Sequence, residues 1–119
     1  MSPDSPTQVR RDVFVPMRDG VKLACDVYLP ANYTPGDTRV PTILERTPYG
    51  KDRKDLIATA RRFAAAGFVH VIQDCRGRGN SEGRHHRTYE PEDGYDSIEW
   101  VAEQEWSDGS VGTIGLSYG

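Results

Sequence analysis

The sequence predicts an α/β domain, in which strands and helices alternate along the chain. Three features indicate this class. Two strand-like segments flank the turn Arg18-Asp19-Gly20, an apolar run at 68–75 has the pattern of a strand buried on both faces, and segments with helical periodicity lie on either side of that run. This succession favours right-handed crossovers between parallel strands, with helices on both faces of the sheet.

The chain opens with a predicted hairpin. After a polar tail at residues 1–8, the segments 9–17 and 21–30 are expected to pair through the Arg-Asp-Gly turn, where Gly20 can adopt positive φ. Apolar side chains at alternate positions from Val21 to Leu29 predict that the second arm is buried on one face only. A loop with two prolines and a glycine then leads to a β-branched strand at 40–46.

Two helices are predicted around the central strand at 68–75. The first occupies about 52–67, with its apolar face built from Leu56, Ala60, Phe63 and Ala64 and its end at Gly67. The second runs from about 92 to 105 and gathers Ile98, Val101 and Ala102 before the Ser-Asp-Gly break. A last strand is expected at 110–116.

Composition is that of an ordinary soluble globular chain. A net charge of −3, with basic residues spread among acidic ones, gives no reason to expect nucleic acid binding. The first twelve residues lack the apolar core of a secretory signal, and no run approaches the ~18 apolar residues of a transmembrane helix, so a cytoplasmic location without membrane contact is predicted. Cys25 and Cys75 are expected to be thiols in a reducing compartment.

The last five residues spell Gly-x-Ser-x-Gly, the pattern of a nucleophile elbow centred on Ser117. By itself the pattern is weak, but the elbow requires a buried strand directly before it, and the strand predicted at 110–116 supplies one. Gly115 and Gly119 stand where a side chain would collide as the chain doubles back. A catalytic serine is favoured, and a plain strand-to-helix turn is the alternative.

A nucleophilic serine needs donors for the oxyanion. One donor is expected to be the backbone N–H of Tyr118, the residue after the nucleophile. The second should come from the loop after the strand at 40–46, which carries Arg-Thr-Pro-Tyr-Gly-Lys-Asp and no glycine cluster. The phenolic O–H of Tyr49 can replace a backbone donor there, although a tyrosine in such a loop can also simply pack or bond locally.

Four segments together resemble one known family. They are MRDGVKLACDVYLP, RTPYGK, DCRGRGNSEG and WVAEQEWSDGSVGTIGLSYG, and in this order they look like the opening of the X-prolyl dipeptidyl-peptidase and cocaine esterase family, which includes α-amino acid ester hydrolases. The tryptophan-containing segment that runs into the elbow is the most specific part. The resemblance implies an α/β-hydrolase fold, with Ser117 as nucleophile, Tyr49 as side-chain oxyanion donor and Tyr118 as backbone donor.

The resemblance also implies parts that lie beyond residue 119. In α/β-hydrolases the acid and the histidine of the triad follow the serine, and family members carry a helical cap and a C-terminal β-sandwich domain. Residues 9–119 are therefore expected to be an incomplete α/β-hydrolase domain, the amino-terminal part of a longer enzyme, cut at the elbow and inert in isolation.

Cofactor sites are not expected. The adjacent His85 and His86 lack the spacing of metal ligands on one helical face. The glycines at 77, 79 and 83 only faintly resemble a dinucleotide loop, because no helix is predicted to begin there. Asp74, Arg76 and these glycines are expected instead to form a structured crossover that borders the active site.

The sequence thus predicts a serine hydrolase that works through an acyl-enzyme on a small ester, amide or peptide substrate, without metal or cofactor. Two substrate hypotheses stay open: removal of N-terminal X-Pro dipeptides, and cleavage of small acyl substrates by an esterase or acylase. A different class is also possible, namely a non-catalytic truncated product or binding module that retains the fold.

Overall fold

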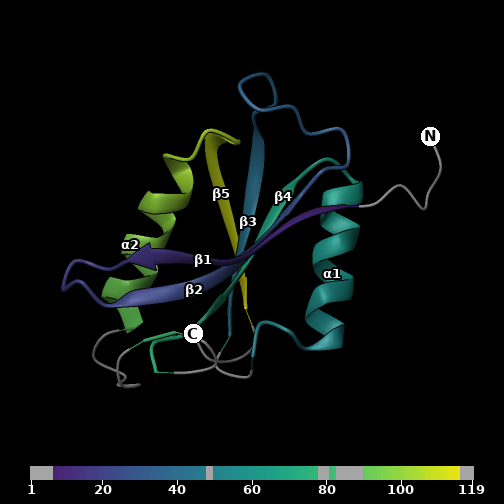
Figure 1. Cartoon of the computed structure of the whole chain (residues 1–119). Coiled ribbons are helices and arrows are strands. Elements are labelled where there is room, and N and C mark those ends of the chain that lie inside the picture. The colour runs from purple at the N-terminus through teal and green to yellow at the C-terminus, as the bar shows by residue number, and fades with distance from the viewer. Residues whose placement is uncertain (1–6, 48–49, 78–80, 83–89, 116–119) are drawn as a thin grey trace.

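Among the residues that the structure describes, five strands form one sheet, and one helix lies on each of its faces (Figure 1). The computed structural model describes residues 7–47, 50–77, 81–82 and 90–115. The elements in chain order are β1 (Gln8–Pro16), β2 (Lys22–Leu29), β3 (Val40–Thr47), α1 (Lys54–Ala65), β4 (Val69–Asp74), α2 (Glu90–Ala102) and β5 (Ser107–Gly115). This order confirms the predicted succession of hairpin, strand, helix, strand, helix and strand.

The sheet has the order β1-β2-β4-β3-β5. β1 and β2 form the predicted antiparallel hairpin, with Gly20 at φ +87° in its turn, and β2 also runs antiparallel to β4. β3 is parallel both to β4 and to β5. Every residue of β4 is buried, as expected for a central strand covered on both faces. The carboxyl ends of β3, β4 and β5 therefore lie at one edge of the sheet.

The prediction that β2 is buried on one face only is wrong. Ala24, Asp26 and Tyr28, on the supposedly polar face, have no exposed surface. Tyr28 packs in a cluster with Leu56 and Ala60 of α1, so the helix covers this face as well. The alternating pattern gave the wrong prediction because alanine and tyrosine occur both in cores and at surfaces. Asp26 can be buried because Arg11 and Lys51 bind its carboxylate.

Helix α1 matches its prediction closely. Leu56, Ala60 and Ala64 are buried against the sheet, and Phe63 stacks on His70 of β4 with ring centroids 5.2 Å apart. The helix ends just before Gly67, whose φ of +100° is the left-handed conformation that closes many helices.

The predicted apolar stripe of α2 is only partly correct, because Val101 is buried in the core as expected but Ile98 is not. The helix begins at Glu90 and ends at Ala102, and the residues that it buries include Asp93, Ser97 and Val101, whereas Ile98 is 37% exposed. The inward face is partly polar because its groups find partners: the Ser97 hydroxyl, for example, donates to Gln73 Oε1 at 3.1 Å. A search for apolar periodicity could not detect such a face.

Strand β5 begins three residues earlier than predicted. Ser107, Asp108 and Gly109 belong to the strand rather than to a break before it. Gly109 has φ +94°, and the register of β5 against β3 is irregular between Val40 and Thr42, which accommodates the turn-like residues inside the strand.

Cys25 and Cys75 are buried thiols rather than a disulfide, as predicted. Burial raises the pKa of Cys25 to about 12, despite a hydrogen bond from Gln73 that favours the thiolate.

With a pKa of about 12, only about 10⁻⁴ of the Cys25 thiol is ionised at pH 8. We therefore expect iodoacetamide at pH 8 to leave Cys25 unmodified in the native protein and to alkylate it in urea, as read by peptide mass spectrometry. Rapid alkylation of the native protein would contradict the packing of β2.

Candidate active site

The three predicted site residues lie outside the described residues. Tyr49 belongs to segment 48–49, and Ser117 and Tyr118 belong to segment 116–119. Their roles as nucleophile and oxyanion donors therefore stay predictions. What the structure does describe is the set of residues from which these segments depart, together with the contacts that hold those residues in place.

The two segments depart from neighbouring strands at the same edge of the sheet. Arg46 of β3 is the register partner of Gly115, the last residue of β5, and the chain leaves β3 one residue later at Thr47. On the other side of β3, Thr47 is the partner of Asp74, the last residue of β4. Because β3 is parallel to both neighbours, the carboxyl ends of the three strands lie side by side at this edge, which is where open α/β sheets commonly bind ligands.

In the crossover after β4, the described residues 75–77 and 81–82 are held by hydrogen bonds, which agrees with the prediction for the part that contains Arg76 and Gly77. The Ser81 hydroxyl donates to the backbone oxygen of Asp74 and accepts the N–H of Ala24 at 2.8 Å. Gly77 has φ +71°, and its N–H donates to the backbone oxygen of Glu82 at 2.9 Å. The described part of the crossover is thus tied to the start of β2. Gly79, Gly83, His85 and His86 lie outside the described residues.

Lys51, two positions after Tyr49, has a nearly buried side chain with 7% exposure. Its ammonium lies 2.8 Å from Asp12 Oδ1 and 3.2 Å from Asp26 Oδ1. Burial by itself lowers the pKa of Lys51, but the hydrogen bonds and ion pairs with the two aspartates outweigh it and raise this pKa. The loop after β3 is therefore connected to the β1–β2 hairpin through a charged cluster.

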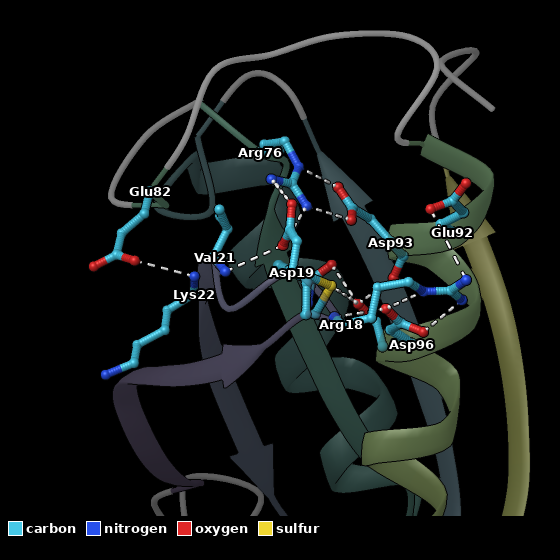
Figure 2. Close-up of polar contacts among 12 residues, drawn as sticks. Arg18, Asp19, Val21, Lys22, Arg76, Glu82, Glu92, Asp93 and Asp96 are labelled. Atoms are coloured by element: carbon cyan, nitrogen blue, oxygen red, sulfur yellow. Dashed lines mark hydrogen bonds and ion pairs between the residues drawn. The ribbon is translucent and has the colours of Figure 1, made fainter.

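Arg76 forms a second charged cluster in the crossover, between the hairpin turn and α2 (Figure 2). Its Nε and Nη2 donate to the two carboxylate oxygens of Asp93, each at 2.8 Å, and its Nη1 and Nη2 donate to Asp19 at 2.9 and 3.2 Å. The hydrogen bonds that Arg76 donates to Asp93 raise the pKa of Arg76 although burial opposes them, and the hydrogen bonds that Arg76 donates to Asp19 lower the pKa of Asp19. Two forked ion pairs on one guanidinium fix its plane.

Sequence reasoning missed these two clusters. The signal that could have revealed the first is Asp26, a carboxylate in the middle of an otherwise apolar strand, because a buried charge requires a partner. No comparable signal identifies its partners, since Lys51 and Asp12 stand in polar stretches. The sequence pointed to Arg76 as part of the crossover but not to Asp19 and Asp93 as its ligands.

Neither a metal centre nor a membrane-crossing helix is found in the described part of the chain. Within residues 7–47, 50–77, 81–82 and 90–115, no three side chains from His, Cys, Asp and Glu come close enough together to hold a metal ion. Among the same residues, no helix is both long and apolar enough to cross a membrane.

Solved structures that resemble this chain define its class. A CocE/NonD family hydrolase from Staphylococcus aureus aligns with a TM-score of 0.77 and 31% identity, over 90% of this chain and 22% of that chain. An α-amino acid ester hydrolase aligns with a TM-score of 0.75 and 32% identity, over 99% of this chain and 25% of that chain. The fold is that of the α/β hydrolases, and the structure contains its amino-terminal strands and first two helices.

The family follows from the sequence comparisons. Residues 19–119 match the model of the X-Pro dipeptidyl-peptidase (S15) family, so the chain belongs to that family. Cocaine esterase from Rhodococcus sp. (strain MB1 Bresler) is 41% identical over 122 residues, an alignment that covers 97% of this chain and 20% of the esterase. The chain thus spans about one fifth of the length of the curated relatives that it matches.

Proposed function

We propose that residues 9–119 form the amino-terminal part of the catalytic domain of a longer serine hydrolase. In this proposal Ser117 is the nucleophile, and Tyr49 and the backbone N–H of Tyr118 bind the oxyanion. The observation that carries it is the pairing of Arg46 with Gly115, because the segments that contain the nucleophile and the oxyanion donor then leave adjacent parallel strands at one edge. Membership of a hydrolase family supports the same assignment.

The proposed reaction is acyl transfer in two steps. Ser117 Oγ attacks the carbonyl carbon of an ester or amide while a histidine, supplied by the chain beyond residue 119, takes its proton. The Tyr49 hydroxyl and the Tyr118 N–H donate to the oxygen that becomes negative. The leaving alcohol or amine departs with a proton from the histidine, and water then releases the acyl group by the same route.

Two substrate classes follow from the names of the relatives. One relative is named a cocaine esterase and another an α-amino acid ester hydrolase, whereas the family is named for X-Pro dipeptides. We propose a small acyl ester as the preferred substrate because the relative with 41% identity is an esterase. We expect the full-length protein to hydrolyse p-nitrophenyl acetate and not Ala-Pro-p-nitroanilide. Hydrolysis of Ala-Pro-p-nitroanilide alone would favour the peptidase.

Covalent labelling tests the nucleophile directly. In the full-length protein, a fluorophosphonate probe is expected to modify Ser117, as located by peptide mass spectrometry, because only an activated hydroxyl reacts with it. Ser117→Ala should abolish this labelling. Ser110→Ala, which changes an exposed serine of β5, serves as the matched control and should leave it intact.

Other labelling results would count against the proposal. Modification of Ser110 or Ser81 in place of Ser117 would show that the assignment of Ser117 as the nucleophile is wrong. A folded full-length protein that takes up no probe and hydrolyses neither substrate would favour the non-catalytic binding module instead.

A further inference from the structure

The loop that contains Tyr49 is held at both ends by the last residue of β4 and the residue after it. At its start, the backbone oxygen of Thr47 accepts the N–H of Cys75 at 2.9 Å. At its end, the backbone N–H of Lys51 donates to Asp74 Oδ1 at 2.8 Å, and this bond is buried. Tyr49 therefore lies in the chain between two anchored residues, which are hydrogen-bonded to the consecutive positions 74 and 75.

The Lys51 side chain adds a third anchor, which comes from a different part of the fold. Its ammonium reaches away from the crossover to Asp26 in the middle of β2 and to Asp12 in β1. Asp26 is fully buried, and its Oδ1 also accepts the backbone N–H of Asp12 at 3.0 Å. If the Lys51 side chain moved, the buried Asp26 carboxylate would lose one of its two cations and keep only Arg11, at 3.5 Å.

The hairpin is deformed at the place where it meets Lys51. Asp12 has φ +52°, the one positive φ of a residue other than glycine within the described chain, and the register of β1 against β2 shifts between Arg10 and Val13. A left-handed residue and a bulge both weaken a regular hairpin. Here they bring the Asp12 carboxylate within 2.8 Å of the Lys51 ammonium.

We propose that Lys51 is a positioning residue for the oxyanion donor Tyr49, held in place by Asp26 and Asp12. The inference rests on the proposed function of Tyr49. A donor stabilises the oxyanion only when it lies within hydrogen-bond distance of the oxygen in the transition state, so small displacements are costly. Lys51, two residues away and fixed by two carboxylates, limits such displacements of the loop.

A double-mutant cycle in the full-length protein tests this role. Lys51→Met keeps the length of the side chain and removes its charge; we expect it to lower kcat for p-nitrophenyl acetate about 10- to 100-fold, with KM changed less than about twofold. In a Tyr49→Phe background the same substitution should change kcat less than about twofold, because the donor to be positioned is already missing. Lys54→Met, at an exposed lysine of α1, is the matched control and should leave kcat unchanged.

The remaining outcomes separate the two proposals. Normal kcat in Lys51→Met, or a loss that persists in full in the Tyr49→Phe background, overturns the role of Lys51. Near wild-type kcat in Tyr49→Phe alone overturns the proposed role of Tyr49. If Lys51→Met does not fold, Asp26→Asn/Lys51→Met is used in the same cycle, since it removes the buried carboxylate together with its cation, and its results are judged by the same criteria.

Discussion

Tyr49→Phe in the full-length protein is expected to lower kcat by ~10²–10³, the usual loss when one oxyanion donor is removed. The substitution keeps the ring and its packing and deletes only the hydroxyl. KM should change little, because the hydrogen bond strengthens as negative charge develops on the oxygen in the transition state. The measurement is steady-state hydrolysis of p-nitrophenyl acetate by both proteins.

The control for this result is an exposed tyrosine on another element of the fold. Tyr95 of α2 is 58% exposed, and Tyr95→Phe removes a hydroxyl without affecting the loop after β3. Its kcat should equal that of the wild type. Melting temperatures of all three proteins must be compared, since a destabilised variant could imitate the loss. A Tyr49→Phe variant with normal kcat would make Tyr49 a packing residue and require a different donor.

Arg76→Met is expected to destabilise the domain by about 3–5 kcal/mol, the cost of removing one partner from a buried ion pair. Arg76 is 4% exposed, and the Asp93 side chain that it binds through two hydrogen bonds is 2% exposed. Without the guanidinium, the nearly buried Asp93 carboxylate loses its charged partner and both of the hydrogen bonds that it accepts from Arg76. The change should appear as a lower urea midpoint for unfolding of the full-length protein.

Arg18 provides a control from the same region (Figure 2). Its guanidinium binds Asp96 at 2.8 Å, but its side chain is 54% exposed. Arg18→Met should therefore shift the urea midpoint far less than Arg76→Met, because Arg18 is largely hydrated and Asp96 keeps more exposed surface than Asp93. Equal shifts for the two variants would mean that the Arg76 cluster is as well hydrated as the surface pair. Arg76→Lys is expected to recover only part of the loss, since an ammonium cannot bind two carboxylates through parallel pairs of bonds.

Sequence reasoning worked where one local pattern determines the structure. The hairpin turn depends on Gly20, the end of α1 depends on Gly67, and the position of β4 depends on one apolar run; all three were predicted correctly. It failed where contacts between distant segments decide burial. The ion pairs of Asp26 and Asp93 were not predicted, because the cations that bind them, Lys51 and Arg76, come from other parts of the chain.

In the candidate site too, the features that depend on a local pattern could be predicted and those that depend on distant segments could not. The motif around Ser117 and the family resemblance depend on residues close in sequence, so these roles could be predicted, and they stay predictions because their residues lie outside the described ranges. The supporting residues could not be predicted in this way. Lys51, Asp12 and Asp26 come from three segments, and only the folded sheet places them together.

The two helices are attached to the sheet by contacts of different kinds, and this sets different limits on evolutionary change. α1 contributes Leu56, Ala60 and Ala64 to an apolar cluster, where residues of similar volume can replace one another with small adjustments. α2 contributes Val101 to the apolar core but also buries Asp93 and Ser97, whose hydrogen bonds depend on direction as well as distance. Homologues can therefore vary the inner face of α1 by gradual drift, whereas a change at Asp93 needs a simultaneous change at Arg76.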